Sequence, residues 1–240
     1  MKYYVLLLAV LLSVGTGSAQ AQRKSKVKIK NGGAPVSAAN RLQPLFGGIS
    51  VAQAEALVGA AFLADIDRSF SSRPEASKFF STKGYEYFTE GKIDTARYRF
   101  NLAWLLDQKN PDAYRGLGVI SSSNPTPDES ISLLIQGLTV DPNNALMLSD
   151  LGASYLIRYQ QTQKKKDLEQ AMTYLQQATT AAPTNAQTWQ DLARGYYYQG
   201  EYPKAWEAVH KGQNLNIASV DIEFIGELQA KLPDPQGMFK

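Results

Sequence analysis

Cysteine is absent from this 240-residue chain, and histidine occurs only at His210. The lack of cysteine excludes disulfides, thiolate metal sites and a lipid anchor on cysteine. One histidine is too few for a histidine-based metal or catalytic site, and the sequence has no glycine-rich phosphate-binding loop of the Walker or dinucleotide type. We therefore expect no enzyme, no catalytic residue, no cofactor and no metal, and we expect His210 on an outer helix face.

Acidic residues are missing from residues 22–54, where every charged residue is basic. The six basic residues are Arg23, Lys24, Lys26, Lys28, Lys30 and Arg41. Turn-forming residues at 31–35 favour a solvated linker, so we predict a basic flexible linker over 22–48. The alternative is a weak contact between this basic tail and an anionic envelope surface, because runs of one charge often act as interaction tails.

The longest apolar run in the chain covers residues 3–14, directly after Lys2, and is interrupted only by Ser13. Small residues follow and end in Ala19-Gln20-Ala21, which is typical of a signal-peptidase cleavage site. The run is shorter than the roughly 20 residues that cross a bilayer, which argues against a membrane anchor. We predict a signal peptide over 1–21 and a periplasmic or secreted protein, whose stability without disulfides depends on packing alone.

The pattern of large and small residues at 77–110 recurs at 111–144, 145–185 and 186–219, with seven extra residues in the third unit. The bulky fourth place of each unit holds Phe80, Tyr114, Leu148 and Trp189. The small eighth place holds Gly84, Gly118, Gly152 and Ala193, and a later large place holds Phe100, Leu134, Leu175 and Val209. This spacing predicts two closely crossing helices in each unit. One pair cannot bury its apolar stripes alone, so the pairs must stack.

The segments around the repeats are predicted to close the two ends of the stack. Residues 49–71 are rich in alanine and leucine after Ser50, a suitable N-cap, and predict one helix that covers the first unit. The repeat region then covers 72–219. Apolar residues over 220–233 predict a capping helix that ends at Pro233, and we expect 234–240 to be a loose tail.

These units resemble tetratricopeptide repeats (TPR), whose bulky-x2-Leu-Gly-x2-Tyr and Ala-x3-Phe patterns they follow. The Asp141-Pro142-Asn143-Asn144 turn also matches the family, and the resemblance covers 77–219. It implies an all-α protein of the exported bacterial type: a right-handed superhelical array of four TPR helix pairs with an N-terminal helix and a C-terminal capping helix.

In this family the first helices of successive units line a concave groove that takes an extended peptide or a partner's helix. The resemblance places twelve residues there: Ser81, Tyr85, Phe88, Arg115, Val119, Ser122, Ser149, Ala153, Leu156, Gln190, Arg194 and Tyr197. Members that clamp a chaperone's C-terminal carboxylates use lysine and asparagine where Ser81 and Tyr85 stand, which argues against that ligand. Tyr85 and Tyr197 could instead complete the core.

The function that the resemblance implies is a non-catalytic exported scaffold or adaptor. Its partner would be a protein or peptide bound in the groove, and not a nucleic acid. Two alternatives remain open from the residues: an envelope-associated hydrolase that uses carboxylates, and a surface-attached protein held by the basic N-terminal tail.

Overall fold

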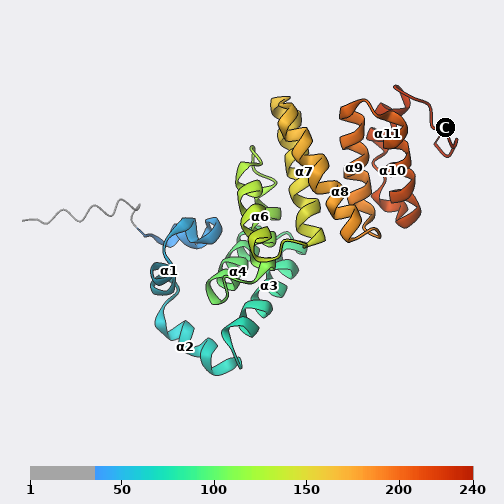
Figure 1. Ribbon diagram of the computed structural model, residues 1–240. Coiled ribbons are helices and arrows are strands. Elements are labelled where there is room, and N and C mark those ends of the chain that lie inside the picture. Colours follow the sequence, from blue (N-terminus) through green and yellow to red (C-terminus); the bar gives the residue numbers. More distant parts are fainter. Residues whose placement is uncertain (1–35, 240) are drawn as a thin grey trace, which may run out of the picture. The chain divides into compact units, whose positions relative to one another are not determined.

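The computed structural model describes residues 36–239, and all regular elements in that range are helical (Figure 1). The α-helices are α1 Val51–Val58, α2 Ala60–Ser69, α3 Arg73–Thr89, α4 Ile93–Leu106, α5 Pro111–Ser121, α6 Asp128–Val140, α7 Ala145–Thr162, α8 Lys165–Ala181, α9 Ala186–Gln199, α10 Tyr202–Leu215 and α11 Ile222–Gln229. Three short 3-10 helices are η1 Ala38–Leu42, η2 Pro44–Gly48 and η3 Ile217–Ser219. Within the same range, no helix is both long enough and apolar enough to cross a membrane. The predicted leader and the linker as far as residue 35 lie outside the described residues.

The helices from α3 to α10 form four antiparallel pairs that follow one another along the chain (Figure 1). Each second helix also packs against the first helix of the next pair. The first helices of the last three pairs begin after Asn110, Asn144 and Asn185, whose side chains accept a backbone N–H of the first turn. Each of these asparagines is the last residue of one repeat and the N-cap of the next helix. The first helices therefore begin at the same interval at which the sequence pattern recurs.

The predicted meeting of small and large residues inside each pair is confirmed by the structure. A Cβ atom added at Gly84 would lie 2.7 Å from the Phe100 ring, and one added at Gly118 would lie 2.8 Å from Leu134. In the third pair the same construction brings Gly152 within 2.6 Å of Leu175. Glycine is therefore needed at the eighth place of the first three units, because the facing side chain fills the volume that a larger residue would occupy.

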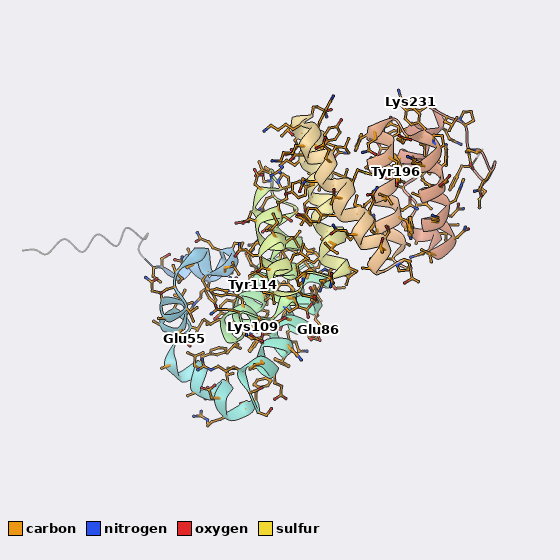
Figure 2. The ribbon with its side chains drawn as sticks, in the orientation of Figure 1. Glu55, Glu86, Lys109, Tyr114, Tyr196 and Lys231 are labelled. Carbon is orange, nitrogen blue, oxygen red and sulfur yellow. The ribbon has the colours of Figure 1, made fainter. Side chains whose placement is uncertain are left out.

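The N-terminal segment differs from the single helix predicted over 49–71. The helix breaks at Gly59, whose φ of +98° lies in a region that glycine enters more readily than other residues. The two resulting helices, α1 and α2, pack near the first repeat, where Arg73 of α3 bonds Glu55 of α1 at 3.0 Å and Asp67 of α2 at 3.1 Å. Figure 2 labels Glu55 in this corner of the structure.

Residues 38–48, predicted as part of a flexible linker, instead form η1 and η2 against α4. Phe46 is fully buried, with its ring centroid 6.4 Å from that of Trp104. The Asn101 side chain donates hydrogen bonds of 2.9 and 2.8 Å to two backbone carbonyls of the segment. A buried aromatic ring and two part-buried hydrogen bonds compensate for the ordering of a short, turn-rich stretch.

Tyr114 links the first two repeats from the interior, where Figure 2 labels it. Its hydroxyl accepts a hydrogen bond of 3.1 Å from the indole N–H of Trp104 and donates one of 3.1 Å to the carbonyl of Gln108. The buried hydroxyl thus has both a donor and an acceptor partner, as a buried polar group requires.

The C-terminal end is more ordered than the predicted loose tail. After α11, the Asp234 carboxylate accepts backbone N–H groups from Gln236, Met238 and Phe239, which folds the tail back. Asp234 also lies 3.0 Å from Nε2 of His210, and the Phe239 ring stacks on the imidazole with centroids 6.2 Å apart. The expectation of an outer-face His210 is therefore wrong, because the folded tail covers that face of α10 and buries the side chain.

Candidate functional site

The twelve residues that the resemblance placed in a groove divide into two groups in the structure. Four of them are buried: Ser81, Ser149, Leu156 and Gln190. The other eight are partly exposed: Tyr85, Phe88, Arg115, Val119, Ser122, Ala153, Arg194 and Tyr197. We call these eight residues, which lie on α3, α5, α7 and α9, the first-helix face.

The buried polar members hold helices together. The hydroxyl groups of Ser149 and Thr188 are hydrogen-bonded at 2.9 Å and join α7 to α9. The Gln190 side chain donates a hydrogen bond of 3.2 Å to the carbonyl of Val209 and joins α9 to α10. These side chains use their hydrogen bonds inside the array.

Ser81 belongs to a buried network around Asn110. The Asn110 amide donates to the hydroxyl oxygens of Ser81 at 2.9 Å and Ser77 at 2.8 Å, while its carbonyl accepts the backbone N–H of Asp112 at 3.0 Å. One side chain thus caps α5 and connects it to α3.

We expect Asn110→Ala to lower the free energy of unfolding by about 1–3 kcal/mol, because it removes a cap and leaves buried hydroxyl groups without their donor. Urea denaturation followed by circular dichroism measures the change. The exposed Asn143 lies in the corresponding turn between the second and third repeats, and Asn143→Ala should change stability by less than about 0.5 kcal/mol. Equal stability of the two variants would show that the network contributes little.

An ion pair crosses the middle of the first-helix face. Nε of Arg115 lies 2.7 Å from a carboxylate oxygen of Asp150, and the guanidinium group reaches the Tyr85 hydroxyl at 3.4 Å. Burial raises the pKa of Asp150, and the charge of Arg115 counteracts that rise. Burial also raises the pKa of Tyr85 to about 12, and its ring packs edge-on against Phe100 at 4.9 Å. Tyr85 therefore belongs mainly to the core, and its hydroxyl accepts the hydrogen bond from Arg115.

The C-terminal end of the face is covered by α11. Arg194 pairs with Asp221 at 2.5 Å, and its guanidinium group lies over the Phe224 ring, 4.5 Å from the centroid. The Tyr197 ring meets the same phenyl ring edge-on at 5.6 Å. The capping helix therefore neutralises the second arginine of the face.

A hollow of about 110 Å³ opens between α5 and α7. Its lining is Val119, Ser122, Ser130, Asp150, Ala153, Ser154 and Ile157. Three of these belong to the predicted set, whereas Ser130, Asp150, Ser154 and Ile157 were missed. Its position in the repeat could have indicated Asp150 as a site residue. Asp150 and Asp191 both stand sixth in their units, directly after an expected groove position.

The side chains that line the hollow offer a ligand both polar groups, such as Ser122 and Asp150, and apolar groups, such as Val119. Within residues 36–239, no group of three or more histidine or acidic side chains is placed to hold a metal ion. A wider hollow of about 500 Å³ lies against α8 and includes Thr173 and Gln176, away from the first-helix face.

No model of a known protein family matches the chain. Among solved structures it is similar to PilF of Pseudomonas aeruginosa, with a TM-score of 0.56 and 22% identity over 69% of this chain and 74% of PilF. It is similar to TTC0263, a thermophilic TPR protein of Thermus thermophilus, with a TM-score of 0.57 and 20% identity over 68% and 86% of the two chains. A chain of the APC/C hetero-tetramer Cut9–Hcn1 matches with a TM-score of 0.54 and 18% identity, over 65% of this chain and 30% of that one. With four capped helix pairs in phase with the sequence repeat, the chain has the tetratricopeptide-repeat fold.

Proposed function

We propose that this chain is a non-catalytic scaffold that binds an extended segment of a partner protein on the first-helix face. The observation that carries the proposal is the hollow of about 110 Å³ between Val119 and Ala153, which interrupts a row of partly exposed polar and aromatic side chains. The similar chain in the Cut9–Hcn1 hetero-tetramer belongs to an assembly of different chains, which supports the idea that this fold is suited to holding a partner.

The dimensions of the face suit an extended segment. Neighbouring packed helices are about 8–10 Å apart, so the distance from α5 to α9 is roughly 20 Å. An extended chain advances about 3.3 Å per residue and would need about six residues to cover that distance. The Ser122 hydroxyl and the Asp150 carboxylate line the hollow and can bond the polar groups of such a segment.

The engagement and the small size of the polar site on this face favour binding over hydrolysis. Asp150 is already held by Arg115 in an ion pair of 2.7 Å. The hollow it lines is also small beside the roughly 300–1,000 Å³ of typical small-molecule sites.

We also propose that the scaffold is exported, on the basis of the predicted leader over 1–21. Expression of the full chain in a bacterium, followed by mass spectrometry of the exported protein, should give an N-terminus near residue 22. A chain that keeps its first residues in the cytoplasm would refute the export proposal and leave the binding proposal intact.

A random-peptide display selection on the full chain tests the binding proposal. The variant Ser122→Arg/Ala153→Arg places two long charged side chains beside the hollow, and we expect it to lose at least tenfold in peptide enrichment. The control variant Ser132→Arg/Thr173→Arg adds the same charge at exposed places on second helices and should select the same peptides as the native chain. Circular dichroism establishes that both variants are folded. Unchanged selection by the first variant would refute binding on this face.

A further inference from the structure

Asp150 and Asp191 occupy equivalent places in two consecutive first helices, but their surroundings differ. Asp150 pairs with Arg115 of the preceding repeat. The residue of α7 equivalent to Arg115 is Ser149, which is buried and hydrogen-bonded to Thr188. Asp191 therefore has no cationic side chain within 4 Å among residues 36–239. Its carboxylate accepts one hydrogen bond of 3.1 Å, from the side-chain amide of Gln187.

The electrostatic surroundings of Asp191 leave its negative charge only partly compensated. Burial and, to a smaller extent, the nearby Asp150 raise its pKa to about 6, against the hydrogen bond from Gln187 and the charge of Arg194. Arg194 in turn is paired with Asp221 of the capping helix. At neutral pH Asp191 is ionised in a partly enclosed place where a further cation would be favourable.

The hollow beside Ala153 provides a second, apolar contact close to Asp191 along the face. The ninth place of the four units holds Tyr85, Val119, Ala153 and Arg194. Alanine is the smallest of these, and the hollow of about 110 Å³ opens at this position with Ile157 on its wall. This volume exceeds the roughly 30 Å³ of one water and is close to that of an aliphatic side chain.

We propose that the first-helix face selects a partner segment in which an aliphatic residue and a lysine or arginine are two residues apart. The aliphatic side chain enters the hollow between α5 and α7, and the cation reaches Asp191 on α9. Side chains two residues apart on an extended chain lie on one side, about 7 Å from each other. The flexible length of lysine or arginine covers the remainder of the roughly 8–10 Å between neighbouring helices. The proposal rests on the proposed function, because it names the partner of the same face.

The charge of the face favours a basic segment over an acidic one. Arg115 and Arg194 are each neutralised by a carboxylate, Asp150 on α7 and Asp221 at the N-cap of α11. Asp191 adds a further negative charge, so the two guanidinium groups of the face have three carboxylates beside them. An acidic peptide would meet no free cation among these five groups, and would be repelled by Asp191.

The test uses peptide display on the full native chain and three variants. Asp191→Asn removes the charge while its amide oxygen can still accept the Gln187 hydrogen bond, and Ala153→Leu fills the hollow. Glu207→Gln removes a charge from an exposed place on α10 and serves as the matched control. The native chain and the control should enrich an aliphatic residue two positions from a basic one. Asp191→Asn should lose the basic preference, about tenfold in enrichment, and keep the aliphatic one, while Ala153→Leu should do the reverse.

A pH series on one selected peptide gives an independent readout. Fluorescence anisotropy should show weaker binding to the native chain at pH 5.0 than at pH 7.5, because Asp191 becomes protonated, and no such change with Asp191→Asn. A basic preference that survives Asp191→Asn, or enrichment of acidic peptides, would overturn this inference while binding on the face stands. If the native chain enriches no peptide, the proposed function falls and this inference with it.

Discussion

Gly152→Leu is expected to lower the free energy of unfolding by about 3 kcal/mol or more, because α7 and α8 touch at this position. A Cβ atom there would lie 2.6 Å from Leu175 and 3.2 Å from the backbone carbonyl oxygen of Ala171. The Leu175 side chain can turn away only into a packed core, and the helix backbone of Ala171 cannot move without displacing α8. Urea denaturation followed by circular dichroism measures the loss.

The matched control for this prediction is Gly226→Leu. Gly226 lies in α11 and has nothing within 4 Å of an added Cβ atom. Leucine is a better helix former than glycine by roughly 1 kcal/mol, so this variant should be as stable as the native chain or slightly more stable. If Gly152→Leu were equally tolerated, close approach of the two helices would not be a requirement of the third repeat.

Arg115→Gln is expected to destabilise the chain by about 2–3 kcal/mol at neutral pH, because it leaves the Asp150 carboxylate without its cation. The side chains of Arg115 and Asp150 are 21% and 28% exposed, so solvent screens the pair only in part. Breaking a buried pair by removing one partner costs about 3–5 kcal/mol, and partial exposure lowers that figure here. The exposed pair between Arg68 and Asp65 provides the control, since Arg68→Gln should cost less than about 0.5 kcal/mol.

The pH dependence of the Arg115→Gln variant distinguishes a lost ion pair from lost packing. Burial raises the pKa of Asp150, and without Arg115 nothing opposes that rise. A carboxyl group whose pKa is higher in the folded than in the unfolded state loses stability as pH rises from the unfolded to the folded pKa. The deficit relative to the native chain should therefore be largest at pH 7.5 and shrink at pH 4. Arg115→Gln/Asp150→Asn should recover most of the stability at pH 7.5, and a deficit that is constant with pH would point to packing alone.

The helix pairs could be predicted from the sequence because their information is local and periodic. Gly84 and Phe100 are sixteen residues apart, and the same relation recurs in the next pair between Gly118 and Leu134. A spacing that repeats in phase identifies which residues face each other without knowledge of the tertiary structure. The structure confirms these contacts. They could be predicted because both residues of each contact belong to the same helix pair.

The polar connections of the candidate site could not be predicted in the same way. Arg115 and Asp150 stand at different places in their repeats, so the period gives no reason to join them. Ser149 and Gln190 were expected at the groove surface, but they turn into the interface between neighbouring helices. A side chain at the edge of the apolar face of a helix can point to solvent or into the interface, depending on the crossing angle of the packed helices. The sequence period alone does not specify that angle.

The ordered termini were missed for a related reason. Phe46 is a single aromatic residue in a turn-rich stretch, and the ring that it meets, Trp104, is far along the chain. At the other end, Asp234 folds the tail over His210 through backbone N–H groups, which have no signature in residue type. Contacts between an irregular segment and a helix leave no periodic pattern in the sequence from which they could be predicted.

The burial of the C-terminal half of α4 on all sides limits how the first repeat can change in sequence. Six consecutive residues, 101–106, are buried, because η1 and η2 cover the side of the helix that faces away from its repeat neighbours. In a helix with one free side, tolerance to substitution rises and falls every three to four residues. In α4 we expect no such periodic variation in tolerance over residues 101–106. The first repeat should therefore accept fewer substitutions there than the second helices of later repeats.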